Sequence, residues 1–250
     1  MNPRFSIVIP ARDEEHYLPR CLDSIERAAA PYSDQVEVIV VINRCTDATE
    51  EIAHARGARV VHEDSKCLST IRNAGARLAE GEILLTIDAD SLMSAGLLQE
   101  VDQLLDSGRY IGGGTRFVFD RRSMLLSLMT WLITALLLVI RVAGACFWCL
   151  RRDFLAVGGF DERLTSFEDV DFARRLKRHG KAQGKRFKVL VSSHVVTAER
   201  KFGLLWRHPL ALPRILFSPN QMSADLLWYE TPRHEKPSAP AVDGEGDERW

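Results

Sequence analysis

The chain has 250 residues, of which 46% are hydrophobic and 27% are charged, and its formal net charge is -1. The hydrophobic share is sufficient for a packed core, and the balanced charge excludes a general electrostatic attraction to nucleic acid. The length allows one large α/β domain or two small ones.

The first part of the chain alternates between strand-like and helix-like segments. Strands are predicted over 5–10, 36–43, 58–63 and 82–88, and helices over 15–29, 47–57 and 68–81. This order predicts an α/β fold with a mostly parallel central sheet and helices on both faces. Ligands of such sheets bind beyond the carboxyl ends of the strands, where we expect Pro10, Asn43 and Asp88.

The second half is less regular. A helix is predicted over 94–108 and a strand with a glycine-rich start over 110–120. Residues 230–250 are rich in proline, glycine and charge and cannot bury much surface. We therefore expect one domain over 1–229 and a disordered tail over 230–250.

The segment 124–140 carries no charged residue and is bracketed by arginines. It falls just short of the roughly 18 to 20 residues that usually cross a bilayer. Three interpretations stay open: a buried or dimer-forming helix, a helix in the membrane interface, and a transmembrane span. The first two would give the chain a homodimer partner or a membrane surface as partner.

The chain contains five cysteines, which is an odd number. Its first residues show no basic segment followed by a long apolar run. These features predict a cytoplasmic protein with reduced thiols, or one bound peripherally to the cytosolic face of a membrane. Cys146 and Cys149 form a CxxC within an apolar stretch, and no second ligand pair at zinc spacing is visible. We expect this stretch to be a buried strand in which cysteine acts as a small hydrophobic residue.

Two acids, Asp88 and Asp90, follow the predicted strand 82–88. Like charges so close raise the cost of ionising each other, and a divalent cation would relieve that cost. The alternative is that these acids cap the helix that begins near Ser94.

A second acidic cluster, Glu168, Asp169 and Asp171, precedes a helical segment with a basic run. One of these carboxylates could act as a general base. Alternatively, the three acids form a charged first helical turn that the helix dipole stabilises. Asp171 is expected to cap the helix.

An ordered set of motifs resembles the family 2 glycosyltransferases of the GT-A fold. The motifs are "VIPARDEE", "RNAG", the DxD at 88–90, "RRDFLAVGGFDE" and "EDVDFARRL", and the resemblance covers roughly residues 5–205. It implies a single GT-A domain that moves a sugar from a nucleotide-diphosphate donor to a hydroxyl acceptor with inversion. It also implies Mn²⁺ or Mg²⁺ as cofactor. The acceptor could be a glycan, a lipid or a small molecule. The apolar segment 124–140 favours a lipid or lipid-linked acceptor.

The resemblance also assigns roles to individual residues. Asp88 would contact mainly the ribose and Asp90 the cation, while Asp169 would be the catalytic base with Glu168 beside it. The remaining candidates for nucleotide-sugar binding are Pro10, Arg12, Glu14, Asn43 and Arg72.

The chain departs from the family pattern at one point. Many members carry two acids where this chain has Ile42 and Asn43, so the base of the nucleotide stays open. The Asn43 amide offers both a donor and an acceptor to a base. His194 is either a further metal ligand or a structural residue.

Two other functions need consideration. A sugar-phosphate nucleotidyltransferase would carry a glycine-rich loop, but "GGGTRF" at 112–117 lies in mid-chain and not after the first strand. A non-catalytic nucleotide-binding or scaffold module has no need for these clustered acids. No aromatic platform interleaves the basic run 174–188, and balancing acids lie nearby in the sequence. We therefore expect a solvated helix face or contact with anionic lipid headgroups, and no nucleic acid partner.

Overall fold

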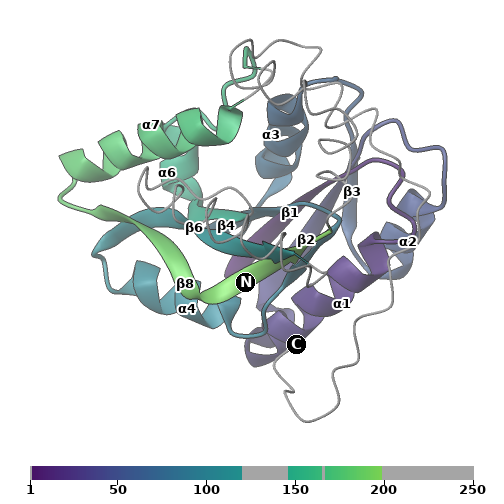
Figure 1. Ribbon diagram of the computed structural model, residues 1–250, viewed down its shortest axis with the longest axis horizontal. Coiled ribbons are helices and arrows are strands. Elements are labelled where there is room, and N and C mark those ends of the chain that lie inside the picture. The colour runs from purple at the N-terminus through teal and green to yellow at the C-terminus, as the bar shows by residue number, and fades with distance from the viewer. Residues whose placement is uncertain (1, 120–145, 165–166, 199–250) are drawn as a thin grey trace.

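The computed structural model describes residues 2–119, 146–164 and 167–198 (Figure 1). Its strands form one sheet of eight strands in the order β3-β2-β1-β4-β7-β6-β8-β5. The strands are β1 (Phe5–Ala11), β2 (Val36–Ile42), β3 (Arg59–His62), β4 (Ile83–Ile87), β5 (Ser91–Met93), β6 (Tyr110–Phe119), β7 (Cys146–Leu150) and β8 (Arg186–Thr197). The helices are α1 (Leu18–Ala29), η1 (Ala30–Gln35), α2 (Thr49–Ala55), α3 (Leu68–Leu78), α4 (Leu97–Asp106), α6 (Arg151–Ala156) and α7 (Glu168–Ala182).

The sheet changes character at β4. Strands β3, β2, β1 and β4 are all parallel, as predicted. Strand β7 runs antiparallel to both β4 and β6, β8 is parallel to β6, and β5 is antiparallel to β8. The α/β class is therefore confirmed, but the sheet is mixed beyond β4. Strand direction there is set by the connections between strands, which hydrophobic patterning does not encode.

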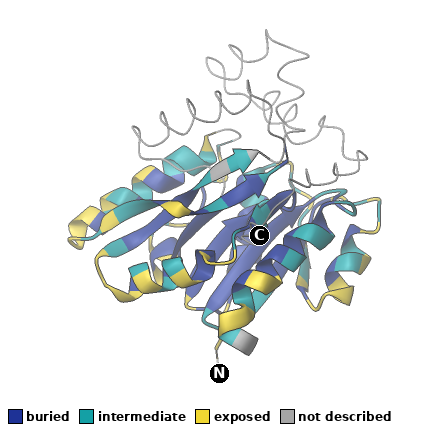
Figure 2. Ribbon diagram, turned by 60° about the horizontal axis from the view of Figure 1, so that its bottom comes forward, coloured by how far each residue is buried: buried dark blue, intermediate teal, exposed yellow. Residues whose placement is uncertain are grey.

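Side chains of the sheet alternate between two hydrophobic cores. The strands of the sheet are largely buried (Figure 2). Phe5, Ile7 and Ile9 of β1 pack on the side of α1, α2 and α4. Val8 points the other way, into the core beneath α3, α6 and α7. Helices on both faces are thus confirmed, and the two groups lie on opposite sides of the sheet in Figure 1.

The CxxC stretch lies in strand β7, and all five cysteines are free thiols. Cys146 and Trp148 face one core, whereas Phe147 and Cys149 face the other. Both cysteines are buried. The predicted buried strand is confirmed.

Helix α1 begins at Leu18, three residues later than predicted. Residues 14–17 form a turn instead, in which the Glu14 carbonyl accepts hydrogen bonds from the amides of Tyr17 and Leu18. The Glu14 amide itself donates to the Thr49 hydroxyl at 2.7 Å. A tertiary contact therefore holds this turn outside the helix.

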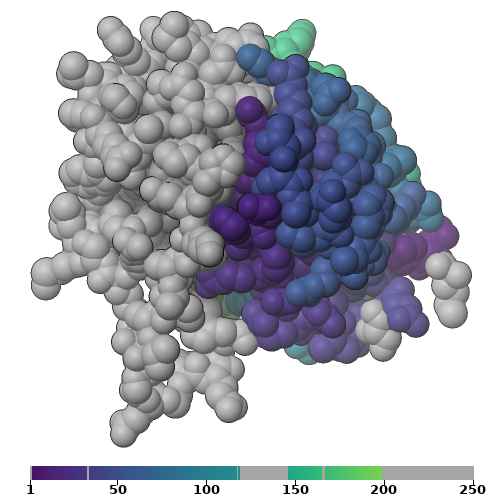
Figure 3. Space-filling view, turned by 90° about the vertical axis from the view of Figure 1, so that its right-hand side faces the viewer, coloured from purple at the N-terminus to yellow at the C-terminus, as the bar shows by residue number. Residues whose placement is uncertain are grey.

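The predicted helix 124–140 and the predicted tail 230–250 lie outside the described residues. Among the described residues, no helix combines the length and the hydrophobicity needed to cross a bilayer. The described part of the face in Figure 3 comes mainly from the N-terminal part of the chain, coloured purple to blue.

Helix α3 lies unusually close to the sheet at Gly75. A Cβ atom at this position would lie 2.4 Å from a methyl carbon of Val8 and 2.8 Å from one of Val41. Both distances are shorter than any normal contact, so the helix can approach β1 and β2 only because residue 75 has no side chain. This approach brings Arg72, one turn earlier in α3, to the ends of the strands.

We predict that Gly75→Ala lowers the free energy of unfolding by about 1–3 kcal/mol, because the added methyl group overpacks the core. Denaturant unfolding would measure this change. Gly96→Ala is the matched control, since a Cβ there has no neighbour within 4 Å. It should shift stability by less than about 1 kcal/mol. Equal effects at both positions would contradict the close approach.

Candidate active site

Arg72 joins the two acidic clusters that the sequence places 80 residues apart (Asp88 to Glu168). One guanidinium nitrogen lies 3.0 Å from an Asp88 carboxylate oxygen at the end of β4. A second guanidinium nitrogen, Nη1, lies 3.1 Å from a Glu168 carboxylate oxygen at the start of α7. The Arg72 side chain is only 10% exposed, so both ion pairs are well shielded from water.

Burial and charge act against each other at this site. Burial by itself would lower the pKa of Arg72, but the charges of Asp88 and Glu168 raise it above its ordinary value. Burial raises the pKa of Glu168 and of Asp169, even though the Arg72 charge opposes the rise. The two acids of α7 are therefore more basic than ordinary carboxylates.

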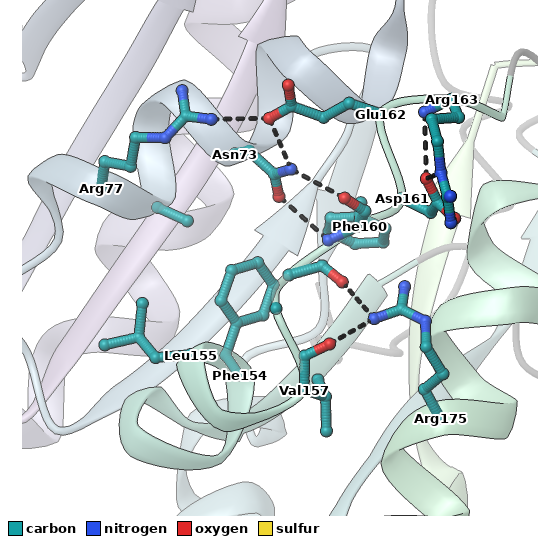
Figure 4. Close-up of a pocket in the computed structure, with 13 residues that line it drawn as sticks. Asn73, Arg77, Phe154, Leu155, Val157, Phe160, Asp161, Glu162, Arg163 and Arg175 are labelled. Carbon is teal, nitrogen blue, oxygen red and sulfur yellow. Dashed lines mark hydrogen bonds and ion pairs between the residues drawn. The ribbon is translucent and has the colours of Figure 1, made fainter.

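Asn73, the neighbour of Arg72, holds the loop that connects α6 to α7 (Figure 4). Its side-chain amide donates to the Phe160 carbonyl at 2.8 Å and accepts from the Phe160 amide at 3.0 Å. The Phe160 ring in turn lies 5.4 Å from the Arg72 guanidinium, in a cation-π contact. A Cβ at Gly159 would lie 2.6 Å from the side-chain oxygen Oδ1 of Asn73. The hydrogen bonds between Asn73 and Phe160, which we call the clamp, therefore require glycine at residue 159.

Three of the four residues of the "RNAG" motif therefore have a physical explanation. Arg72 joins the acids, Asn73 clamps the loop, and Gly75 lets the helix approach the sheet. The sequence identified Arg72 as a candidate but missed Asn73 and Phe160. Their role depends on a contact across 87 residues, for which the sequence carries no local signal.

The same loop bounds a cavity of about 530 Å³ that is also lined by α3, α6 and Arg175 of α7 (Figure 4). Its rim carries Arg77, which pairs with Glu162 at 2.6 Å, and Arg163, which pairs with Asp161. Arg175 donates to two loop carbonyls, those of Val157 and Gly159. The charges on this rim are thus engaged with one another and with the loop.

The loops after β1 and β2 are joined side by side. The Asp13 carboxylate accepts from the Thr46 amide at 2.7 Å, and the Glu15 amide donates to Asp47 at 3.0 Å. Arg12 is partly buried and Glu14 is buried in this region. Pro10, the residue before the end of β1, pairs with Val41 within the sheet.

Backbone strain gathers around these loops. In the described part of the chain, three non-glycine residues have positive φ: Asp13 (49°), Arg44 (53°) and Phe167 (59°). They lie after β1, after β2 and directly before α7. Such conformations cost free energy and cluster at functional sites.

Asn43 is fully buried, and its amide nitrogen is engaged with the protein itself. It donates to the carbonyls of Glu63 and Ser65, at 2.5 and 2.9 Å. Asn43 therefore fixes the loop between β3 and α3. Both hydrogens of its side-chain amide are therefore used within the protein.

The DxD acids lie on a turn at the end of β4, closed by a hydrogen bond from the Ser91 amide to the Asp88 carbonyl. Strand β5 separates them from α4, whose N-cap is Gly96, so they do not cap that helix. Asp90 is only 4% exposed. Burial raises the pKa of the nearby Cys21 thiol well above its ordinary value, and the charges of Asp90, Asp88 and Glu14 raise it further.

This donor set fits a hard divalent cation. Asp88 and Asp90 offer carboxylate oxygens in a region of concentrated negative charge. Mg²⁺ is usually held by one or two carboxylates together with phosphates and waters. A third cluster, Asp13, Cys45 and Asp47, also brings its ligand atoms within 4.8 Å of one another. Its acids already accept hydrogen bonds from loop amides, which accounts for their convergence.

Two other sequence candidates lie away from the DxD turn or outside the cap position. His194 exchanges backbone and hydroxyl hydrogen bonds with Ser94, at the end of β5 away from Asp90. Asp171 does not cap α7, because the helix begins at Glu168. It lies within the first turn and pairs with Arg175 at 2.6 Å.

The fold is that of solved GT-A glycosyltransferases. The mannosyltransferase PcManGT from Pyrobaculum calidifontis, in complex with GDP-Man and Mn2+, superposes with a TM-score of 0.64 at 20% identity and covers 90% of this chain and 69% of its own. S. aureus TarS 1-349 with UDP-GlcNAc gives 0.62 at 17% identity, over 92% and 72% of the two chains. The predicted GT-A fold is confirmed.

Sequence comparison gives the family. The sequence model of the protein family "Glycosyl transferase family 2" matches residues 6–134, and the chain belongs to this family. Uncharacterized glycosyltransferase Rv0539 of Mycobacterium tuberculosis is 35% identical over 111 residues, which are 44% of this chain and 48% of that protein. Uncharacterized glycosyltransferase EpsJ of Bacillus subtilis is 31% identical over 108 residues, 41% and 30% of the two. The chain thus matches less than half the length of these relatives.

We predict that Arg72→Ala lowers the free energy of unfolding by roughly 3 kcal/mol at neutral pH, because it leaves buried carboxylates without a partner. The loss should shrink toward mildly acidic pH. Without Arg72, the pKa values of Glu168 and Asp169 in the folded protein should rise further. An acid whose pKa is higher in the folded than in the unfolded state lowers the stability of the fold when it is ionised, and this penalty disappears as the acid is protonated at lower pH. Chemical unfolding at several pH values would measure both effects.

Arg77→Ala is the matched control on the same helix. Its side chain is 59% exposed and its ion pair lies at the surface, so the cost should stay below about 1 kcal/mol at every pH. A pH-independent loss in Arg72→Ala would contradict the role of the buried acids.

Proposed function

We propose that the protein transfers a sugar from a nucleotide-diphosphate donor to a hydroxyl acceptor, with inversion at the anomeric carbon. The observation that carries this proposal is the Arg72 bridge, which joins the DxD turn to the acid pair of α7. A transferase needs both groups together, one beside the leaving diphosphate and one beside the acceptor. Family membership supports the same class of reaction.

The donor would bind across the ends of β1, β2 and β4. Arg12, Glu14 and Asp88 are the side chains that we assign to nucleotide and ribose, with the backbone near Pro10. Arg72 would act on the donor indirectly, since two of its nitrogens are engaged with Asp88 and Glu168. The TarS and PcManGT structures are complexes with UDP-GlcNAc and GDP-Man, which supports a nucleotide sugar without selecting a base.

Asp90 and Asp88 would hold Mn²⁺ or Mg²⁺. When bound, such a cation supplies a positive charge that stabilises the departing diphosphate. The Mn2+ in the PcManGT structure supports this assignment.

Asp169 would remove the proton from the acceptor hydroxyl, with Glu168 beside it. A general base works best when its pKa approaches the working pH, and burial raises the pKa of both acids in that direction. The acceptor oxygen attacks the anomeric carbon opposite the diphosphate, and its proton stays on Asp169. The diphosphate leaves with the electron pair of the broken bond.

The acceptor is proposed to be a lipid or lipid-linked molecule, because the apolar segment 124–140 belongs to the same chain. The same segment supports attachment to the cytosolic membrane face or pairing of two subunits. A nucleotidyltransferase is less well supported, because Gly112, Gly113 and Gly114 lie inside β6 and pair with β7 and β8. A Cβ at Gly113 would lie 1.8 Å from the Lys188 carbonyl oxygen, so these glycines serve packing.

We predict that UDP or GDP binds more tightly with Mn²⁺ than with a chelator, and that Asp90→Ala abolishes the difference. The effect should be at least tenfold, since a cation held by these carboxylates would also attract the phosphates. Isothermal titration calorimetry of both nucleotides measures it. Asp106→Ala, at an exposed acid far from the DxD turn, is the control. Equal affinity with metal, with chelator and in the variant would refute the metal site.

We predict that Asp169→Asn leaves nucleotide binding within a few-fold of wild type and lowers turnover about a hundredfold, the usual scale for a lost general base. Asparagine has nearly the same shape but cannot take the proton. Turnover is measured with the nucleotide sugar selected by a thermal-shift screen. Near wild-type turnover would transfer the role to Glu168, and binding without any turnover in the wild type would favour a scaffold.

A further inference from the structure

The outer side of α7 carries a strongly basic surface that the proposed reaction does not use. From residue 172 to residue 198 the sequence contains eight lysines and arginines and no aspartate or glutamate. The eight are Arg174, Arg175, Lys177, Arg178, Lys181, Lys185, Arg186 and Lys188. Such an imbalance contrasts with the net charge of -1 for the whole chain.

Helical geometry gathers part of this charge on one line. Phe172, Leu176 and Gly180 are the buried side of α7. Because an α-helix has 3.6 residues per turn, Arg174, Arg178 and Lys181 lie opposite this buried side, and all three are exposed. We call these three residues and Lys185, which follows the helix, the basic face.

No nearby acid neutralises the basic face within the described part of the chain. Asp171, the acid of α7 nearest to it, is held by Arg175. Asp153 of α6 is held by His179 on another side of the helix, at 3.1 Å. The described residues provide no ion pair for the side chains of the basic face.

The positive surface continues beyond the end of the helix. Arg186 and Arg109 are both exposed, and their backbones are joined by a hydrogen bond of 2.9 Å. The guanidinium groups of Arg186 and Arg109 lie 5.3 and 5.9 Å, respectively, from the centre of the Tyr110 ring. Six positive side chains therefore share this end of the molecule.

We propose that the basic face docks the protein on an anionic lipid bilayer. Clusters of four to eight lysines and arginines on an amphipathic helix are typical of binding to anionic headgroups. The exposed line of α7 has no aromatic side chain on which a base could stack, which disfavours single-stranded nucleic acid. The uncharged segment 124–140 of the same sequence also favours a bilayer over a nucleic acid.

This inference does not depend on the proposed transferase activity. The acids of α7 lie at its N-terminus and the basic face lies on its outer side, so the two can be changed separately. Docking through α7 would hold the acid pair near the bilayer without burying it. It would also bring a lipid-linked acceptor close to the site.

The test is flotation of the full chain with phosphatidylcholine vesicles, with and without about one third phosphatidylglycerol. We expect binding to the anionic vesicles to exceed binding to the neutral ones at least tenfold, and to fall at high salt because ions screen the attraction. Arg178→Glu with Lys181→Glu should weaken binding to anionic vesicles at least a hundredfold. The two charge reversals change the charge of the basic face by four units, and each unit near such a surface contributes about fivefold.

The matched control is Arg27→Glu with Arg56→Glu, which changes the net charge equally at exposed positions on α1 and after α2. It should keep most of the binding to anionic vesicles. Thermal unfolding and nucleotide titration show whether both variants remain folded, and Arg178→Gln with Lys181→Gln provides a milder change with an intermediate loss. The inference fails if neutral and anionic vesicles bind equally, if both double variants lose binding alike, or if duplex DNA competes the vesicles away.

Discussion

A single buried guanidinium organises this molecule. Arg72 is held by α3, pairs with a carboxylate from the sheet and with one from α7, and is covered by the Phe160 ring. Removing a charge of this kind from water is costly unless its partners are placed well. The close approach at Gly75 and the clamp at Asn73 both serve that placement. The geometry of the two acidic clusters thus depends on one side chain that belongs to neither.

The loops around this bridge are held in place by contacts within the protein. The loops after β1 and β2 hold each other through side chain to backbone hydrogen bonds, and Asn43 holds the loop before α3. Asp13 and Arg44, which have positive φ, lie in the loops after β1 and β2. Preorganised loops lower the entropy lost on binding, so more of the interaction energy remains for the ligand.

Helix α7 combines three different surfaces over 15 residues. Its first turn presents acids to the site, one side packs Phe172 and Leu176 into the core, and the opposite side is basic. Acids at the N-terminus of a helix are favourable because of the helix dipole, so the proposed catalytic role of these acids agrees with local stability. The N-terminal acids and the basic outer side also give the helix a charge asymmetry, which would orient the molecule at a charged surface.

The sequence by itself was sufficient for the α/β class, for the four parallel strands, for the buried CxxC strand and for the motifs of the family. These features depend on local hydrophobic patterning and on short runs of residues, which one sequence records directly. The direction of β7, the engagement of Asn43 with the loop before α3, the distance of His194 from Asp90 and the clamp on Phe160 were decided only by the tertiary structure. Each of these depends on which distant segments meet, because strand direction and long-range hydrogen bonds are set by the packing of the whole chain.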